Sequence, residues 1–315
     1  MSSLHRPHPE IPARSLPRDS GVSGLLNIDK PRGLTSYDVV SQVRRATGQR
    51  RVGHAGTLDP LATGVLVICL GQAARLMEYI ADSAKRYQAT IRFGVVTSTW
   101  DMEGEVIERR PCDGLTLAAI QKALPAFTGR IAQVPPMYSA LKRDGQPLYR
   151  LARRGITVER TPRIVEVHDI RIVGWQPPDL VVQIECSKGT YVRSLAYDLG
   201  QALGVGAILA DLARLAVGSF RLEEAVSLEA LIAAGANDAW KCHLRPMRAA
   251  LGDMPGVEVD GDTARQITFG RAVALDPKGA TQRCYAYDSE DTVLAIMRRS
   301  GEGDLWQPEK VLLAR

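Results

Sequence analysis

The sequence predicts a mixed α/β fold of the α+β kind, followed by a small β-rich module near the C-terminus. Up to about residue 203, short strand-like runs are interspersed with segments of helical periodicity, whereas only strand-like runs stand out after residue 251. The apolar content of 45% over 315 residues is sufficient for one sizeable core and a smaller one. We find no internal repeat.

The N-terminal half contains four clear elements. Residues 24–31 form an expected strand that a proline ends, and a helix follows for which Ser36 is the expected N-cap and Gly48 the stop. Residues 65–70 are uniformly apolar and predict a buried strand. Residues 87–93 alternate between apolar and polar, which predicts a strand with one buried face.

The elements of the C-terminal half are predicted less uniformly. We expect a short helix at 116–124, a hairpin of strands 164–175 and 180–186, and an amphipathic helix at 192–203. Residues 233–253 have weak periodicity and are expected to link to the final module. Its expected strands lie near Val257 and at 272–275, 284–288, 292–297 and 310–313.

Composition excludes several classes of protein. No apolar run approaches membrane-spanning length, and residues 1–22 lack the apolar stretch of a signal peptide, so we expect a flexible N-terminal segment and a cytoplasmic location. The five cysteines have no C-x-x-C spacing, which favours reduced, mostly buried thiols over disulfides or a zinc site.

Positive charge is concentrated in the middle of the chain. The net charge is +5, and between Lys142 and Arg163 seven bases face two acids. Residues 252–315 carry eight bases and eleven acids. If the partner is a polyanion such as RNA, electrostatics assigns the main contact to the middle segment.

The run from Gly53 to Gly64 places a single acid, Asp59, in a constrained loop directly before the buried strand 65–70. Its glycines permit unusual backbone angles, and Pro60 disfavours a helical conformation at Asp59. An aspartate before proline is most often a turn former. The position at the mouth of a sheet also suits a carboxylate that takes part in chemistry.

A second constellation lies at residues 186–194, where a strand is expected to end and a helix to begin. Such a junction presents free backbone N–H groups and the positive end of a helix dipole. Arg193 adds a guanidinium that could hold Asp59 ionised against desolvation. It could instead cap a helix or pair with Asp198 or Glu185, so the sequence leaves this pairing open.

Four motifs in order, at residues 24–36, 53–60, 135–142 and 188–193, resemble the TruB family, the bacterial tRNA pseudouridine-55 synthases. The resemblance runs from about Gly24 to Phe220. It implies a pseudouridine-synthase-like catalytic domain over residues 23–235, with a central mixed, largely antiparallel sheet flanked by helices and an RNA-clamping insertion at about 134–160. It further implies a small PUA-like domain over residues 251–315.

The activity that this resemblance implies is isomerisation of the T-loop uridine of tRNA, at position 55, to pseudouridine by base flipping. Asp59 matches the catalytic aspartate, Tyr87 the active-site tyrosine that stacks on the base, and Arg193 the group that orients the aspartate. Whether the carboxylate attacks C1′, attacks the base or removes a sugar proton stays open. No metal and no cofactor are required.

Further residues match positions that contact RNA in the family. His54 is expected near the displaced nucleotide, and Tyr191 and Leu212 in the pocket wall. Other expected RNA contacts are Lys30, Tyr138, Lys142, Arg143, Arg150, Arg153 and Arg154. The sequence departs from the family pattern at Ser98, Trp100, Ile208 and Ala213.

The expected partner is the T stem-loop of tRNA, with no membrane and no obligatory protein partner, and the protein is expected to be a monomer. Two alternatives remain. One is a synthase guided by a separate RNA, although such relatives usually carry longer basic extensions. The other is an RNA-binding tRNA-folding factor in which catalysis is dispensable.

Overall fold

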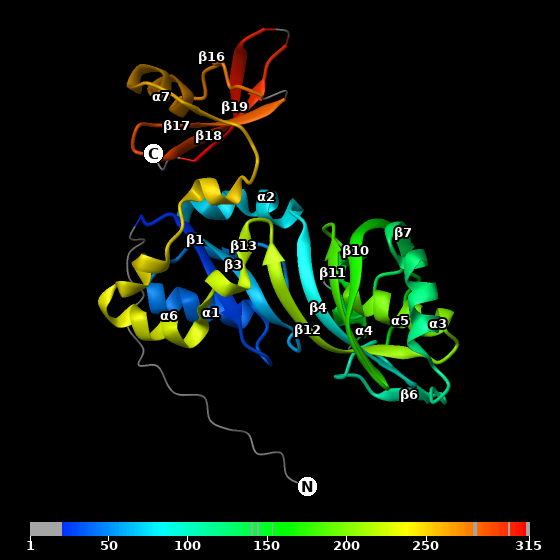
Figure 1. Cartoon of the computed structure of the whole chain (residues 1–315). Helices are drawn as coiled ribbons and strands as arrows, with labels where there is room; N and C mark the ends of the chain where they lie inside the picture. The colour runs from blue at the N-terminus through cyan, green and yellow to red at the C-terminus, as the bar shows by residue number, and fades with distance from the viewer. Residues whose placement is uncertain are drawn as a thin grey trace.

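The largest sheet of the molecule has ten strands. The computed structural model describes residues 21–139, 141–143, 145–152, 154–279, 282–301 and 303–312. The strands of the ten-stranded sheet follow the order β14-β1-β3-β12-β4-β11-β10-β7, with β2 paired to β3 and β13 to β12 (Figure 1). Among the described pairs, β1–β14 and β3–β12 are parallel and the others antiparallel. The predicted mixed, largely antiparallel sheet is therefore confirmed.

The strands of this sheet are β1 (Gly24–Lys30), β2 (Val52–His54), β3 (Thr63–Leu70), β4 (Lys85–Phe93), β7 (Gly129–Gln133), β10 (Arg163–Gln176), β11 (Asp179–Cys186), β12 (Ala207–Val217), β13 (Phe220–Arg221) and β14 (Val226–Ser227). Two separate hairpins are formed by β5 (Val95–Thr97) with β6 (Val106–Arg109), and by β8 (Lys142–Arg143) with β9 (Gln146–Pro147).

Helices cover one face of the sheet along its whole width. The main core joins apolar residues of β1, β3, β4, β11 and β12 to α1, α3, α5 and α6. In Figure 1, α1 and α6 lie beside β1 and β3, whereas α3 and α5 lie at the β10–β11 end. The helices are α1 (Ser36–Thr47), α2 (Met77–Asp82), α3 (Leu117–Ala123), α4 (Leu148–Ala152), α5 (Val192–Ala202), α6 (Leu228–Ala234) and α7 (Gly261–Thr268).

The start of α1 corrects the sequence prediction by one residue. The N-cap is Thr35, whose side chain accepts from the Asp38 N–H while Asp38 accepts from the Thr35 N–H, a capping box. Ser36 is buried instead, and its Oγ bonds both the N–H and the carbonyl of Leu58. This contact fixes the residue that precedes Asp59.

Strand predictions succeeded where the side-chain pattern was regular. Strand β4 buries Tyr87, Ala89, Ile91 and Phe93 as expected, and β10 and β11 form the predicted hairpin. The central strand β12 was not predicted. Two bulges in its pairing with β4 break the strict alternation, so its apolar residues do not show a period of two.

The C-terminal part is β-rich, as predicted. Strands β15 (Gly256–Glu258), β16 (Val273–Ala274), β17 (Arg283–Tyr287), β18 (Val293–Arg299) and β19 (Leu305–Val311) form a five-stranded sheet with its own small core. The last strand begins earlier than expected, and α7 was not predicted. Residues 235–250 form three short 3₁₀ segments, η4 (Gly235–Asn237), η5 (Ala239–His243) and η6 (Met247–Ala250).

The C-terminal sheet packs on α2 and η6, which cover the face of the large sheet opposite to α1 (Figure 1). Val293, Ile296 and Leu312 share a second core with β1, β3 and α2, and Lys310 donates to the Arg75 carbonyl at 2.8 Å. The domain boundaries given above stay a prediction. The expected flexible segment is residues 1–22, of which residues 1–20 lie outside the described part of the chain. Among the described residues, no helix is both long and apolar enough to cross a membrane.

Candidate active site

The loop that carries Asp59 joins β2 to β3 and is held by side chains from three other elements. Ser36 of α1 binds Leu58, as described above. Arg214 of β12 donates to the carbonyls of Gly56 at 3.0 Å and Thr57 at 3.5 Å. Within the loop, the Ala62 N–H donates to the Asp59 carbonyl. These bonds fix the backbone on both sides of Asp59.

Lys30 contributes to the same support, and this corrects its expected role as an RNA contact. Its side chain is fully buried, and Nζ donates to the carbonyls of Pro31, Leu34 and Pro60 at 2.9, 2.6 and 3.3 Å. Burial lowers the pKa of Lys30 to about 8, with Asp59 opposing that shift. A buried ammonium on three carbonyls positions the loop but does not reach a solvent-exposed phosphate.

Gly64, the second residue of β3, has φ of +95°, and a Cβ there would lie 2.3 Å from the Arg214 carbonyl oxygen. Gly64→Ala is therefore expected to lower the free energy of unfolding by roughly 3 kcal/mol, because steric overlap adds to the conformational cost. Urea denaturation measures the change.

Gly33→Ala is the matched control for that substitution. Gly33 also has positive φ, +87°, but a Cβ there would meet nothing within 4 Å. It should lose only the conformational part, about 1–2 kcal/mol. Equal losses in the two variants would show that the approach of β3 to Arg214 is not tight.

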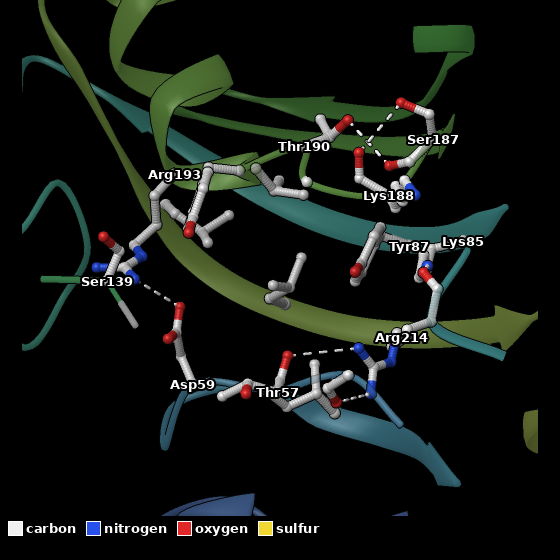
Figure 2. Close-up of a pocket in the computed structure, with 18 residues that line it drawn as sticks. Thr57, Asp59, Lys85, Tyr87, Ser139, Ser187, Lys188, Thr190, Arg193 and Arg214 are labelled. Atoms are coloured by element: carbon white, nitrogen blue, oxygen red, sulfur yellow. Dashed lines mark hydrogen bonds and ion pairs between the residues drawn. The ribbon is translucent and has the colours of Figure 1, made fainter. Parts of the chain in front are cut away.

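The structure brings Asp59 and Arg193 together, a pairing that the sequence alone did not decide. Arg193 Nη2 lies 2.9 Å from Asp59 Oδ2, and the Arg193 side chain is 4% exposed whereas Asp59 is 35% exposed (Figure 2). The same guanidinium lies 3.4 Å from Asp101 Oδ2. It also donates to the carbonyls of Thr99 at 3.3 Å and Tyr138 at 2.7 Å. Arg193 is thus fixed at the first turn of α5 by four acceptors.

Electrostatics at Asp59 is a balance of opposing effects. Desolvation raises the pKa of the Asp59 carboxyl above its ordinary value of 3.8, and the Arg193 guanidinium opposes this rise. Asp101 adds to the rise by like-charge repulsion. The result is a carboxylate that Arg193 orients and that retains more basicity than a solvated aspartate.

A cavity of about 260 Å³ extends from Asp59 into the sheet, and Figure 2 shows its lining. Tyr87 of β4, Leu212 of β12 and Tyr191 at the start of α5 all line it, so the three pocket residues expected from the sequence meet around one space. Burial raises the pKa of the Tyr87 phenol, and the positive charge of Arg214 opposes that rise. An aromatic ring, an aliphatic wall and a carboxylate therefore face one small volume.

Sequence reasoning missed Arg214 and Lys85, which line the same cavity. Arg214 is 1% exposed, donates to the Asp59 loop, and lies near enough to Tyr87 for its charge to act on the phenol. A single base within the apolar run 207–217 was the available signal, since a charged residue in a buried strand needs fixed partners. Lys85 precedes Tyr87 by two residues, and burial lowers its pKa to about 8.

A second, more open cavity of about 560 Å³ lies on the other side of Asp59 and Arg193. His54, Tyr138 and Tyr149 line it, so these residues lie on the outer side of the carboxylate. Burial lowers the pKa of His54, and its Nδ1 has no hydrogen-bond partner among the described residues. A neutral imidazole therefore lines this opening, with its unpaired Nδ1 buried.

The basic residues of the expected insertion lie partly at the surface. Arg143, Arg150 and Arg154 are exposed, and Arg143 donates to the Glu159 carbonyl at 2.7 Å. Lys142 lies in β8, and Arg153 lies outside the described residues. Across the described part of the chain, no group of three or more His, Cys, Asp or Glu side chains is placed to hold a metal ion.

Comparisons with known proteins agree with this arrangement. Residues 44–192 match the family model "TruB family pseudouridylate synthase (N terminal domain)", and residues 193–252 match "tRNA pseudouridylate synthase B C-terminal domain". These two matches together cover more than half of the chain and include Asp59, Tyr87 and Arg193.

Curated relatives are similar over nearly their whole length. The chain is 44% identical to tRNA pseudouridine synthase B of Dehalococcoides mccartyi strain BAV1, over 93% of this chain and 97% of that protein. It is 42% identical to the protein of the same name from Burkholderia mallei, over 98% and 97%. Among solved structures, a chain of a Cbf5–Nop10–Gar1 complex superposes with a TM-score of 0.73 at 25% identity, over 93% of this chain and 85% of that one.

Proposed function

The chain belongs to the TruB family of pseudouridylate synthases, and we propose that it converts the T-loop uridine at position 55 of tRNA to pseudouridine. One observation carries the proposal: the Asp59–Arg193 pair lies at the mouth of a small cavity that Tyr87 and Leu212 line. The relatives named tRNA pseudouridine synthase B support tRNA as the substrate.

The reaction requires a carboxylate in a partly closed pocket. The N1–C1′ bond of uridine breaks, the uracil turns, and C5 bonds to C1′ before water reaches the sugar. C5 then loses its hydrogen as a proton, and N1 gains a proton, so the product is an isomer of uridine. Asp59 acts as the nucleophile, in the way that carboxylates trap glycosyl centres. Attack on C1′, attack on the base and removal of a sugar proton all use the same ionised carboxylate. Arg193 holds that carboxylate in the orientation seen in Figure 2.

Tyr87 supplies a surface for the base. Because burial raises the pKa of its phenol, Tyr87 is neutral at physiological pH. Its ring and the Leu212 side chain enclose the uracil while it turns, and the Tyr191 ring closes the wall near Asp59. Arg214 holds the Asp59 loop through its bond to the Gly56 carbonyl and lines the same cavity as the Tyr87 ring.

The target uridine must leave its RNA fold to reach this cavity. We assign the outer cavity, with His54, Tyr138 and Tyr149, to the nucleotides that the uridine leaves behind. The exposed arginines of the 134–160 insertion bind phosphates of the T stem-loop. We propose that the protein acts in the cytoplasm as a monomer, without a guide RNA or a protein partner.

The direct test uses the purified protein alone on an unmodified tRNA transcript, with release of tritium from 5-³H-uridine as the measure of turnover. Stoichiometric release is expected, with the new pseudouridine mapped to position 55. A transcript with cytidine at that position is the control and should release nothing. A folded protein that binds tRNA but releases no tritium would refute the enzymatic assignment in favour of a binding or folding factor.

Turnover is expected to fall as the solution becomes acidic. Since the folded-state pKa of Asp59 is raised, the reactive carboxylate is present above that pKa and is lost as pH falls through it. Single-turnover rates over a pH series measure this acid limb. A rate that stays constant down to the ordinary aspartate range, about pH 4, would contradict the raised pKa.

Charge reversal at Arg150 and Arg154 is expected to weaken tRNA binding. Removal of one ion pair with a phosphate should reduce the slope of log K against log salt by about 1, with turnover of saturating tRNA little changed. Arg171→Glu is the control, because Arg171 is an exposed base on β10 beside α3 and outside both cavities. An unchanged salt slope in Arg150→Glu and Arg154→Glu would remove these residues from the RNA interface.

A further inference from the structure

Trp100 has a strained backbone next to the catalytic pair. It lies in the loop between β5 and β6 with φ of +63°, a left-handed conformation that is unusual for a bulky residue. The loop is held by a bond from the Leu209 N–H to the Trp100 carbonyl at 3.0 Å and by one from the Trp100 N–H to the Thr97 carbonyl at 3.3 Å. Strain of this kind persists where surrounding contacts compensate for it.

The side chain of Trp100 makes two such contacts. Its ring stacks on Tyr197 of α5, with centroids 4.2 Å apart and planes at 14°. The guanidinium carbon of Arg160 lies 5.3 Å from the centre of the Trp100 ring, within the range of a cation–π interaction. Trp100 therefore joins α5 to Arg160, the basic residue at the end of the 134–160 insertion.

The Tyr197 contact reinforces the site of Arg193. Arg193 and Tyr197 are four residues apart on α5, so they lie on the same face of that helix, one turn apart. The two residues that flank Trp100 are the ones that bind Arg193, through the Thr99 carbonyl and the Asp101 carboxylate. The 99–101 loop is thus attached to α5 at two points, and Trp100 makes the second.

The Arg160 contact reaches the base of the insertion. Arg160 Nη1 donates to the Pro135 carbonyl at 3.2 Å, which closes the insertion where its two ends meet. Near the same end of the insertion, the Tyr138 carbonyl accepts a hydrogen bond from Arg193 at 2.7 Å. The insertion therefore contacts Arg193 directly through Tyr138 and indirectly through Arg160 and Trp100.

We propose that Trp100 is a positioning residue that ties the base of the RNA-clamping insertion to Arg193 and so holds the guanidinium against Asp59. The inference rests on the proposed function and deepens it. RNA bound to the insertion steadies Arg160, the Trp100–Tyr197 stack passes this constraint to the 99–101 loop, and the loop fixes Arg193. Binding of RNA and orientation of the nucleophile are thereby coupled through one indole ring.

This role has a specific consequence for proton binding at Asp59. The charged groups near the Asp59 carboxyl are Arg193 and Lys30, which favour its ionised form, and Asp101 and Glu103, which repel it; the Tyr87 and Tyr191 phenols are also close. Once the 99–101 loop is released, Arg193 is held less closely against Asp59. Asp101 is released with the same loop, so its repulsion of Asp59 also weakens, but the weakened charge and hydrogen bond of Arg193 have the larger effect. The pKa of Asp59 then rises further, and the acid limb of turnover moves to higher pH.

The test compares Trp100→Asn with Trp100→Phe. Asparagine tolerates the left-handed backbone but removes the ring, whereas phenylalanine keeps a ring that can stack on Tyr197. Trp100→Asn is expected to lower the single-turnover rate roughly 10- to 100-fold, the range for a misplaced catalytic group, and to raise the acid limb while tRNA affinity stays the same. Trp100→Phe is expected to recover most of the rate and the wild-type pH profile.

Substitutions of the two partners test the same link from the other side. Tyr197→Leu should reproduce the effects of Trp100→Asn, whereas Tyr197→Phe should not. Arg160→Met should shift the acid limb in the same direction by a smaller amount. Trp175→Leu is the control, because Trp175 packs against Phe93 in the core and is distant in sequence and contacts from the 99–101 loop.

Titration of the Asp59 carboxyl by ¹³C NMR gives a readout that does not need turnover. A wild-type protein that makes no pseudouridine would defeat the proposed function, yet a raised Asp59 pKa in Trp100→Asn would still support the link to Arg193. Wild-type rate and pKa in Trp100→Asn and Tyr197→Leu would overturn the inference. So would an equal loss of rate at every pH with the Asp59 pKa unchanged. If Trp100→Asn does not fold, the two Tyr197 variants decide by the same criteria.

Discussion

Asp59→Asn is expected to abolish pseudouridine formation while tRNA binding is retained. The amide is close in shape to the carboxylate and can still accept a bond from Arg193, but it lacks the negative charge that each of the three possible routes requires. The loss of the nucleophile in a covalent mechanism typically removes several orders of magnitude in rate, so product should fall below detection in the tritium-release assay.

Binding of tRNA provides the internal control for that variant. The exposed arginines of the insertion are unchanged in this variant. The dissociation constant for tRNA should therefore stay near the wild-type value, and its dependence on salt should be the same. Substitution also removes a desolvated charge, so the protein should remain folded. Turnover close to that of the wild type would exclude Asp59 as the nucleophile, and loss of binding together with turnover would point to a structural role.

Arg193→Met is expected to lower turnover by about a hundredfold or more and to destabilise the fold. The guanidinium neutralises Asp59 and the buried Asp101 and binds two backbone carbonyls, so its loss leaves the buried Asp101 carboxylate without a charged partner. Breaking a buried pair in this way typically lowers the free energy of unfolding by about 3–5 kcal/mol. Chemical denaturation and single-turnover kinetics measure the two losses separately.

A double variant separates the two roles of Arg193. Addition of Asp101→Asn to Arg193→Met removes the unpaired charge, so stability should recover in part, whereas turnover should not, because Asp59 still lacks its orienting group. Arg193→Lys keeps the charge but cannot reach all four acceptors with one ammonium group, and it should fall between wild type and Arg193→Met. If turnover recovers along with stability in the double variant, Arg193 acts only on folding.

Strands were predicted correctly where their apolar and polar residues follow a regular pattern, and were missed where that pattern is broken. Strand β4 and the β10–β11 hairpin were predicted because a period of two, or a turn-rich break between two apolar runs, is a local property. Strand β12 was missed although it lies at the centre of the sheet and carries Leu212 and Arg214. Its bulges are set by pairing with β4, which no local pattern reveals.

Sequence reasoning about the site was most accurate for individual residues and least accurate for their surroundings. Asp59 was singled out by its glycines and by Pro60, and its pairing with Arg193 was suggested by charge alone. Lys30 was expected at the RNA surface, but two carbonyls of the β1–α1 loop and one of the Asp59 loop enclose it. Asp101 gave no signal, because its importance comes entirely from the guanidinium it meets.

Local sequence was enough to predict the mixed fold class, the β-rich C-terminal part, the constrained loop of Asp59 and the family to which the chain belongs. These follow from composition, period and short motifs, which neighbouring residues suffice to specify. The folded chain was needed to show that Asp59, Arg193, Tyr87 and Leu212 enclose one cavity and that Lys30 and Arg214 support it from within. Those relations depend on which strands pair and how tightly side chains pack between them, and such contacts join residues far apart in the chain.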